Sequence, residues 1–256
     1  MDNKRVALER RERLAVVTLR GQGDANLIDP TTAFEIADAC AEVRQDDAIW
    51  VVLLTATGSV FCNGTDVESF RTSVADTWAL ASLRVSEMVA SIEKPVVCAL
   101  NGDAIDQGLE LALACDLRMA SDQATFGMTQ LERGSMPWDG GTQRLPRLIG
   151  RSRATEMLLT SKMVSAEEAA DIGLVNMLVE PSKLNDAAIE FASVIATHGP
   201  IALRYLKEAV LKGLDLTVEQ GLRLEADLSF LLQSTSDRSE GLTSFLERRK
   251  PEYSGE

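Results

Sequence analysis

Long apolar runs alternate with helical patterns over the first two thirds of the chain. Residues 48–58 (AIWVVLLTATG) and 96–102 (VVCALNG) begin as continuous apolar runs that end at a glycine, which is typical of strands buried on both faces. Residues 14–20 alternate like a strand, whereas 31–47 and 77–93 carry apolar residues at helical spacing, and the threonines that open 31–47 suit a helix cap. Strands that alternate with helices predict an α/β core with parallel strands.

The last third of the chain reads as helix. After short strand candidates at 116–121, 124–128 and 174–180, helical patterns cover 140–150, 153–161 and 165–173, and nearly everything from Pro181 onward. The pattern at 140–150 is interrupted or bent near Pro146. We therefore divide the chain into an α/β core (residues 1–182) and a helical C-terminal region (183–256). Because no Pro/Gly-rich linker separates them, we expect the helical region to pack on the core or on a neighbouring subunit.

Composition narrows the class of protein. The 256 residues are 45% hydrophobic and 25% charged, as expected for a large soluble globular domain. No apolar run is long enough to cross a bilayer and the N-terminus lacks the apolar segment of a secretory signal, so we expect a cytoplasmic protein without a membrane partner. The net charge of −13 argues against nucleic acid as a partner, because phosphate binding needs a basic face.

Few residues are available for metal binding or histidine chemistry. The cysteines lack the spacing of a metal site, so we expect buried, reduced thiols and no metal (Cys40, Cys62, Cys98 and Cys115). The single histidine, His198, is expected in a surface loop beside Gly-Pro. Acid–base chemistry therefore falls on carboxylates, or on lysine, tyrosine or cysteine.

Two stretches share one design, a buried strand that ends in a tight turn: LLTATGSVFCNGTD and VVCALNGDAIDQGLE. Ligands of α/β folds collect at such strand ends, where backbone N–H groups stabilise developing negative charge. Neither stretch contains a phosphate-binding loop motif. The second turn leads into a helical pattern with Glu110 in its first turn, and it places Asp106 and Gln107 where turns favour glycine.

Several ordered blocks carry a resemblance to one family. FCNGTD, KPVVCALNGDAIDQGLELALACDLRMASDQATFGM, GGTQRLPRLIGRSRATEMLLTSKMVSAEEAADIGLVNMLV and EGLTSFLERRKPEY resemble the enoyl-CoA hydratase/isomerase (crotonase) family over nearly the whole length. The resemblance implies a spiral of ββα units, a C-terminal helical trimerisation region, and homotrimers or hexamers of paired trimers. It also implies an acyl-CoA substrate, with coenzyme A as part of the substrate and no further cofactor.

The resemblance also assigns an oxyanion hole. The backbone N–H groups of Thr65 and Gln107 would hold the thioester oxygen, and Gly64, Asp66 and Gly108 would contact the substrate beside them. Loss of one such donor typically costs about 3–4 kcal/mol of transition-state stabilisation.

Glu110 matches the first catalytic glutamate of the hydratases. Its place in the first turn of a helix favours the ionised form through the helix dipole, which suits a base; the alternative is an ordinary helix-stabilising carboxylate. The second hydratase glutamate falls on Gln130, which can hold water but cannot exchange a proton, so standard two-carboxylate hydration is in doubt. Glu132 would face the same side of an extended segment, two residues further along.

Four further residues have two interpretations each. Asp139 is either a reserve acid, since relatives place a functional aspartate one position earlier, at Trp138 here, or the N-cap of the helix that follows. Trp138 either walls the acyl pocket, which would favour a flat or cyclic acyl group, or packs as ordinary core. Arg248 and Lys250 either approach the 3′-phosphate of coenzyme A, sometimes across a subunit boundary in the family, or form a solvated helix end.

The leading functional hypothesis is hydration of an unsaturated acyl-CoA through an enolate held by the oxyanion hole, with a cyclic acyl group as one option. Double-bond isomerisation is the runner-up, followed by CoA-dependent C–C hydrolysis or decarboxylation that uses Asp106 or Asp139. A catalytically silent CoA-binding paralogue, suggested by Gln130, is the non-enzymatic alternative.

Overall fold

Two sheets organise the chain. The computed structural model describes residues 4–21, 23, 25–68 and 83–256. One sheet has six strands in the order β1-β2-β3-β5-β7-β10, and the other has four in the order β4-β6-β8-β9; only the β1–β2 and β8–β9 pairs are antiparallel among these strands. Their bounds are β1 Val6–Arg11, β2 Leu14–Leu19, β3 Val51–Ala56, β4 Val60–Cys62, β5 Val96–Leu100, β6 Asp103–Ile105, β7 Leu117–Ser121, β8 Thr125–Gly127, β9 Val164–Ser165 and β10 Met177–Val179.

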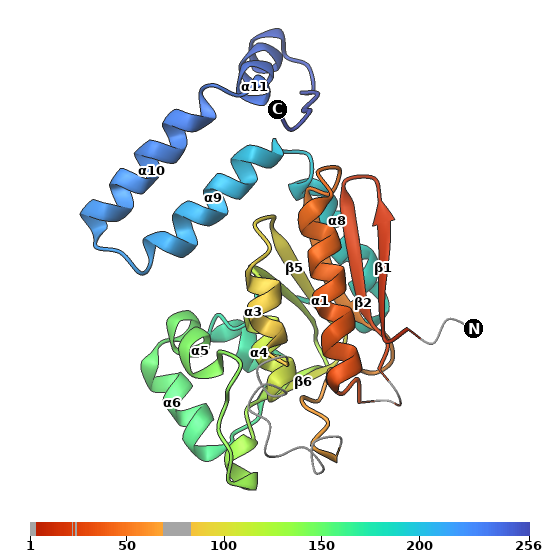
Figure 1. Cartoon of the computed structure of the whole chain (residues 1–256). Helices are drawn as coiled ribbons and strands as arrows, with labels where there is room; N and C mark the ends of the chain where they lie inside the picture. The colour runs from red at the N-terminus through yellow and green to blue at the C-terminus, as the bar shows by residue number, and fades with distance from the viewer. Residues whose placement is uncertain (1–3, 22, 24, 69–82) are drawn as a thin grey trace.

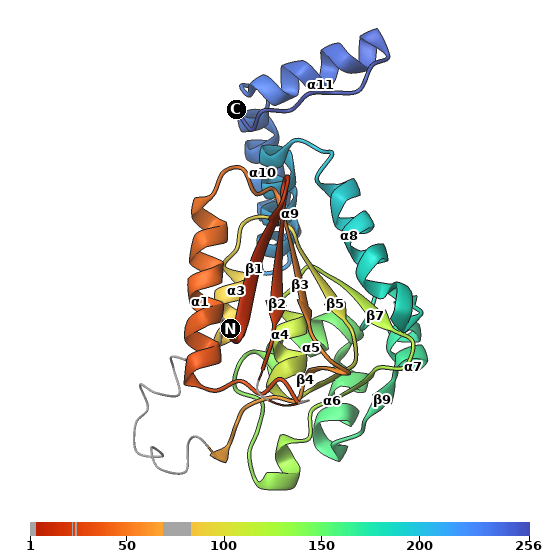
Figure 2. The same ribbon diagram turned by 90° about the vertical axis from the view of Figure 1, so that its right-hand side faces the viewer.

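Helices cover both faces of the six-stranded sheet (Figures 1 and 2). α1 lies against one face and α8 against the other, as the edge-on view of Figure 2 shows. The bounds are α1 Pro30–Gln45, α3 Val85–Ala90, α4 Gln107–Leu113, η2 Gln130–Arg133, α5 Gly141–Ile149, α6 Arg151–Thr160, α7 Ala166–Asp171, η3 Pro181–Lys183, α8 Leu184–Ile195, α9 Pro200–Gly213, α10 Val218–Leu232 and α11 Ser236–Glu247. The predicted α/β class with parallel strands is confirmed.

The continuous apolar runs are explained by burial on both sides of the sheet. In β3, Val52 and Leu54 join the core on the α1 side, whereas Val51 and Leu53 join the core on the α8 side. The same alternation divides β5 between the two cores. Successive side chains of a strand point to opposite faces, so a strand that is covered on both faces needs apolar residues throughout.

Several predicted elements differ in detail. The helix at 31–47 starts at Pro30 and is capped by Asp29, which accepts the N–H of Thr32, so the threonines are not the cap. The helix through Pro146 continues unbroken to Ile149. Of the pattern at 77–93, residues 85–90 are helical, and 77–82 lie outside the described residues. β1 has no counterpart among the predicted elements, because its polar, half-exposed residues hide the alternation.

Short strands of the second sheet follow the long strands of the first. β4 follows β3, β6 follows β5 and β8 follows β7, and the three short strands run parallel with Cys62 opposite Ala104 and Ala104 opposite Phe126. Their carboxyl ends therefore meet at one edge. This repeat is the ββα arrangement that the family resemblance implies.

The C-terminal helices leave the core. Figures 1 and 2 show α9 and α10 as an antiparallel pair that projects from one end of the molecule, with α11 beyond them. Large apolar side chains on these helices are exposed, among them Leu206, Leu222 and Phe230. No helix in the described ranges is both long enough and apolar enough to traverse a bilayer.

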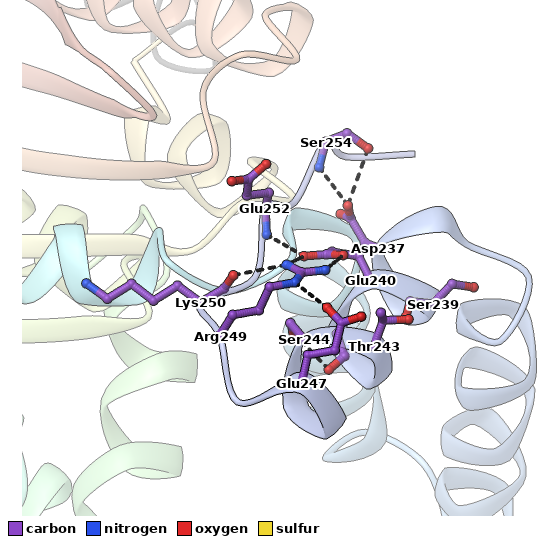
Figure 3. A network of polar contacts seen from close by, with 11 residues as sticks. Asp237, Ser239, Glu240, Thr243, Ser244, Glu247, Arg249, Lys250, Glu252 and Ser254 are labelled. Atoms are coloured by element: carbon purple, nitrogen blue, oxygen red, sulfur yellow. Dashed lines mark hydrogen bonds and ion pairs between the residues drawn. The ribbon is translucent and has the colours of Figure 1, made fainter.

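A polar network fastens the last residues of the chain to α11 (Figure 3). The guanidinium of Arg249 donates to both carboxylate oxygens of Glu240, and the N–H of Glu252 donates to the same carboxylate. Asp237 accepts the N–H groups of Ser254 and Gly255. The chain end therefore packs back along the helix that precedes it.

Gly102 illustrates how tightly the two sheets are joined. A Cβ at this position would lie 1.9 Å from the carbonyl oxygen of Ser59, a backbone atom that cannot move aside alone. We expect Gly102→Ala to destabilise the fold by about 2–4 kcal/mol through this overlap. Gly213→Ala, where a Cβ meets nothing within 4 Å, is the matched control. Denaturant unfolding of the two variants measures the difference, and equal stability would contradict the close approach.

Candidate active site

Three turns at the edge of the four-stranded sheet bring the predicted site residues together. Thr65 follows β4, Gln107 follows β6 and Gln130 follows β8. In the sheet, Cys62, Ala104 and Phe126 lie side by side. Along the chain, Thr65, Gln107 and Gln130 each follow one of these paired residues by three or four positions. Residues far apart in the sequence thus occupy neighbouring turns because the strands are parallel and in register.

The first two turns touch through glycine. Gly64 has a φ of +91°, and a Cβ there would lie 3.0 Å from the Cβ of Asp106 and 3.4 Å from the amide nitrogen of Gln107. A Cβ on Gly108 would lie 2.0 Å from the carbonyl oxygen of Cys62. Glycine is required at both positions for this approach.

The two predicted oxyanion-hole N–H groups lack acceptors among the residues that the structure describes. Thr65 and Ile28 form an isolated parallel bridge. Its hydrogen bonds join Ile28 to the two neighbours of Thr65: the N–H of Ile28 donates to the carbonyl of Gly64, and its carbonyl accepts the N–H of Asp66. The N–H of Thr65 therefore points away from Ile28. Neither this N–H nor that of Gln107 donates to a protein acceptor in the described part of the chain. Two unpaired donors in adjoining turns fit a site for a carbonyl oxygen.

Asp106 takes a backbone conformation that favours glycine. Its φ is +53° and its ψ is −121°, as at the first central position of a type II′ turn. The side chain compensates, since Oδ1 accepts the N–H of Thr129 at 2.5 Å and the carboxylate pairs with Arg133. These contacts attach the turn before Gln107 to the segment that bears Gln130. The sequence places Asp106 where a turn favours glycine, and the positive φ of this residue agrees with that expectation.

The side chain of Gln107 lies in the interior instead of at the pocket entrance. Its Oε1 accepts the hydroxyl of Thr65 at 2.6 Å. Its Nε2 donates to the carbonyl of Leu83 at 2.6 Å and to Oδ2 of Asp139 at 3.1 Å. The residue is 1% exposed.

Glu110 is fully buried one turn into α4. Its Oε1 accepts the N–H of Asp139 at 2.8 Å and the N–H of Gly141 at 2.7 Å. Its Oε2 is buried without a partner among the described residues. One oxygen of the carboxyl therefore holds the loop before α5, and the other is left for a ligand or a proton.

The electrostatics of Glu110 differ from the expectation. The helix dipole was expected to favour the ionised form, yet burial raises the pKa of Glu110 from 4.5 to about 7. The N–H groups of Gly141 and Asp139 oppose this effect, and the charge of Asp139 adds to it. Desolvation outweighs the helix dipole because the carboxyl is fully enclosed: a helix N-terminus typically contributes about 0.3–1 kcal/mol, whereas full burial can shift the pKa of a carboxyl by up to about 3–5 units. A pKa near neutrality suits a group that exchanges protons.

Asp139 does not cap the helix that follows it. α5 has Gly140 as its N-cap without a side-chain hydrogen bond. Oδ2 of Asp139 accepts the N–H and the hydroxyl of Ser86, at 2.9 and 2.8 Å, in the first turn of α3. Oδ1 is buried without a partner within the described ranges, and burial raises the pKa of Asp139 above its ordinary value of 3.8. The capping interpretation is therefore wrong for α5, and the carboxyl has a free oxygen.

Gln130 is buried with both side-chain polar atoms unpaired among the described residues. The expected extended segment is instead a 3-10 helix, Gln130–Arg133, in which Glu132 is exposed. Glu132 therefore does not replace Gln130. Met128, just before this helix, approaches Gly141 beside Glu110, since a Cβ on Gly141 would lie 2.8 Å from the sulfur of Met128 and 3.0 Å from Oε1 of Glu110.

Unpaired buried polar atoms mark this region. Glu110, Gln130 and Asp139 each have at least one, and such atoms cost about 1–3 kcal/mol apiece in a folded protein unless something occupies them. Folded proteins satisfy most buried polar atoms, so the unpaired atoms in these neighbouring turns, counted over the described residues, are available to bind a ligand. No cluster of three metal-ligating side chains occurs among the residues the structure describes.

Of the remaining predicted residues, Trp138 lies in the site loop, whereas Arg248 and Lys250 lie elsewhere. Trp138 is partly buried and packs against the core beside Asp139. Lys250 lines a surface pocket with Arg11 and His198 at the β1–β2 turn, and Arg248 ends α11. Figures 1 and 2 place α11 at the opposite end of the molecule from α4, so these cations and the site are not brought together within one chain.

Ser86 and Arg144 belong to the site without having been predicted. Ser86 orients Asp139, and Arg144 donates to the carbonyl of Asp139 at 3.0 Å while its charge lowers the pKa of that carboxyl. Ser86 lies in none of the blocks that resemble the family, and Arg144 lies in one of them without having been singled out. Ser86 is 53 residues from its partner, and only the packing of α3 against α4 brings them together.

Comparisons with known proteins agree along the whole chain. A family model described as Enoyl-CoA hydratase/isomerase matches residues 9–256. The (E)-benzylidenesuccinyl-CoA hydratase of Thauera aromatica is 40% identical over 254 residues, which cover 98% of this chain and 99% of that protein. The crotonyl-CoA hydratase of Syntrophomonas wolfei is 35% identical and covers 99% of both. A crystal structure of enoyl-CoA hydratase from Bacillus anthracis has a TM-score of 0.93 at 35% identity, covering 98% of this chain and all of that one.

The buried carboxyl of Glu110 predicts a pH-dependent stability. The unfolded chain loses this proton near pH 4.5, whereas the folded chain keeps it up to about pH 7. The folded state therefore loses stability as pH rises between these values, by roughly 3 kcal/mol in all. In Glu110→Gln this loss is absent, so the variant gains stability relative to the parent as pH rises from 4.5 to 7.5.

Denaturant unfolding across this pH range measures the gain. Glu132→Gln, the same change at an exposed site, is the control. A constant difference between Glu110→Gln and the parent at every pH would contradict the raised pKa.

Proposed function

The chain belongs to the enoyl-CoA hydratase/isomerase family, and from this premise we propose that it is a hydratase that adds water to the double bond of an unsaturated acyl-CoA. The family and the crotonase-type fold agree with the expectation from sequence. The single observation that carries the catalytic proposal is the pair of buried carboxyls, Glu110 and Asp139, that each keep one oxygen unpaired beside the two free backbone donors.

The thioester is activated by the backbone. The N–H groups of Thr65 and Gln107 hold its oxygen, and Gly64 and Gly108 allow the turns and the substrate to approach one another. Attack on the β-carbon moves an electron pair onto this oxygen, so hydrogen bonds from the two donors strengthen as the enolate forms. Stabilisation of this kind is usually the largest single contribution to acyl-transfer and enolate chemistry.

Proton transfer falls to the two carboxyls. In the reactive form of the pair, Asp139 carries the shared proton and Glu110 is ionised. Oε2 of Glu110 then takes a proton from water as the hydroxyl group adds to the β-carbon, and Oδ1 of Asp139 supplies its proton to the α-carbon when the enolate collapses. The other oxygen of each carboxyl is already occupied by donors, so the geometry supports these assignments. The pair keeps one proton in total, because Glu110 gains one and Asp139 loses one. Transfer of that proton from Glu110 to Asp139 then restores the starting state for the next turnover.

Gln130 orients the water. Its amide has both a donor and an acceptor free, so it can bind a water molecule without exchanging a proton with it. Asp66, beside the oxyanion turn, contacts the coenzyme A part of the substrate in this proposal. Trp138 forms one wall of the acyl pocket, a role that its partly buried position supports.

The acyl group is proposed to be flat or cyclic. One relative that is 40% identical is named as a hydratase of (E)-benzylidenesuccinyl-CoA, and its name places an aromatic ring on the alkene. The indole of Trp138 offers a complementary flat surface.

Assembly completes the proposal. The exposed apolar residues of α9–α11 support a homotrimer, or a hexamer of paired trimers, in the cytoplasm, built through the helical region 183–256. Arg248 and Lys250 then reach the phosphates of coenzyme A in a neighbouring subunit, since they do not approach the site in their own.

Double-bond isomerisation is the second candidate, and one observation favours it. Gln130 stands where a hydratase places its second acid, while Glu110 and Asp139 can pass a proton from one carbon to another without adding water. The mass of the product separates the two reactions, because isomerisation leaves it unchanged.

We expect the wild-type protein to convert an aromatic or cyclic enoyl-CoA into a product heavier by one water. Incubation in ¹⁸O-labelled water, followed by mass spectrometry, places the label in the new hydroxyl group. A panel that also contains straight-chain enoyl-CoAs tests the acyl preference. An unshifted mass with a moved double bond would establish the isomerase instead, and no turnover on any member would leave a binding protein.

Removing either carboxyl should abolish most turnover. We expect Glu110→Gln to lower kcat at least about 100-fold, and Asp139→Asn by roughly 100-fold, because each substitution deletes one proton-transfer group. Affinity for coenzyme A should stay nearly unchanged, since neither side chain is placed against the nucleotide. Glu132→Gln should retain parental kcat. Near-normal turnover in Glu110→Gln would contradict its role.

A further inference from the structure

The amide side chain of Gln107 joins parts of the site that the main chain keeps separate. It contacts Thr65 on the neighbouring turn, the carbonyl of Leu83 before α3, and the carboxyl of Asp139 before α5. Its own backbone N–H belongs to the oxyanion hole in the proposed function. One residue therefore has a backbone group at the thioester oxygen and a side chain at the proposed acid.

We propose that the Gln107 side chain is a positioning residue that fixes the Asp139 carboxyl, and so couples the acid to the oxyanion hole. The inference rests on the proposed hydration, because it assigns Asp139 the role of proton donor. It assigns a role to the side chain of Gln107, which stands at a position where such turns favour glycine.

The hydrogen-bond count on Asp139 carries the argument. Oδ2 accepts from Gln107 Nε2, Ser86 N and Ser86 Oγ, whereas Oδ1 has no partner among the described residues. A carboxyl with one oxygen occupied by donors carries its proton on the other oxygen. The donors therefore direct the acidic proton to Oδ1 and prevent the carboxyl from rotating to exchange its two oxygens.

Gln107 differs from Ser86 in what it connects. Ser86 ties Asp139 to α3, away from the oxyanion turn, whereas Gln107 ties it to the turn that holds the thioester oxygen. The carbonyl of Leu83 fixes which end of the amide faces Asp139, because a carbonyl only accepts and therefore requires Nε2 on that side, while the Thr65 hydroxyl donates to Oε1. All of these groups are largely removed from water, so a small displacement of the amide is not corrected by solvent.

The charged groups that face Asp139 are few. Within the described ranges they are Glu110 from α4 and Arg144 from α5, while α3 contributes the uncharged Ser86. The donated hydrogen bond of Gln107 lowers the pKa of Asp139 and opposes the effect of burial. Loss of this donor therefore raises the pKa of Asp139, and a negative charge in its place raises it further.

Two substitutions separate the contacts of the amide. Gln107→Met keeps the length and the backbone N–H but loses every side-chain hydrogen bond. Gln107→Glu keeps an acceptor for Thr65 but turns the donor toward Asp139 into a second acceptor. Gln143→Met, the same change at an exposed site on α5, is the control. Asp139→Asn provides the background for a double-mutant cycle.

We expect kcat to fall about 10- to 100-fold in both Gln107 variants, as for loss of a hydrogen bond to a charged group, with KM changed by less than about threefold. The alkaline limb of the pH–rate profile should move to higher pH, and further in Gln107→Glu. In Asp139→Asn, the added Gln107→Met substitution should have little further effect. Gln143→Met should behave as the parent.

Isotope-edited infrared spectroscopy of the aspartate carboxyls, assigned by the loss of a band in Asp139→Asn, follows the titration of Asp139 without turnover. An upward shift of that pKa in both variants supports the inference even if the wild-type protein hydrates no substrate on the panel, which would overturn the proposed function alone. Parental kcat and an unchanged titration of Asp139 in Gln107→Met would overturn the inference. The inference would also be overturned if Gln107→Glu behaved as the parent while Gln107→Met was impaired, because the contact with Thr65 alone would then account for the role of the amide.

Discussion

The site depends on one buried carboxyl that serves as a structural anchor and as a reactive group. Oε1 of Glu110 holds two backbone N–H groups of the loop before α5, and that loop is what delivers Asp139 and Trp138 to the strand ends. The same burial that makes these hydrogen bonds strong raises the pKa of Glu110 to about 7. Structure and reactivity therefore cannot be separated here: a more exposed carboxyl would hold the loop less firmly and would titrate too low to exchange protons at neutral pH.

The second constraint is the register of three short parallel strands. Because β4, β6 and β8 pair with Cys62, Ala104 and Phe126 in line, the turns that follow them must lie side by side. Glycine at 64 and 108 lets those turns approach to backbone contact, and that contact sets two free N–H groups next to each other. The proposed oxyanion hole thus follows from sheet geometry, and the backbone N–H at position 107 is present whichever non-proline side chain stands there.

The sequence alone predicts the parts of the structure that depend on local pattern. Continuous apolar runs identify β3 and β5, and the motif resemblance locates Thr65, Gln107 and Glu110. The sequence does not predict Ser86 as the partner of Asp139, because the two residues are 53 positions apart and only helix packing brings them together. Nor does it predict that burial overrides the helix dipole at Glu110, because desolvation depends on every element that covers the side chain.

The presence of Asp139 also accounts for Gln130. Glu110 and Asp139 are both enclosed, and the charge of Asp139 already raises the pKa of Glu110, so the pair cannot both ionise cheaply. A third carboxyl at position 130, buried against the same water, would add a further charge to be neutralised without water to screen it. An amide there keeps the hydrogen-bonding groups that hold a water molecule and adds no charge. In the proposed mechanism the amide at 130 and the aspartate at 139 therefore belong together: the second acid stands on the loop that Glu110 holds in place, instead of at the strand end.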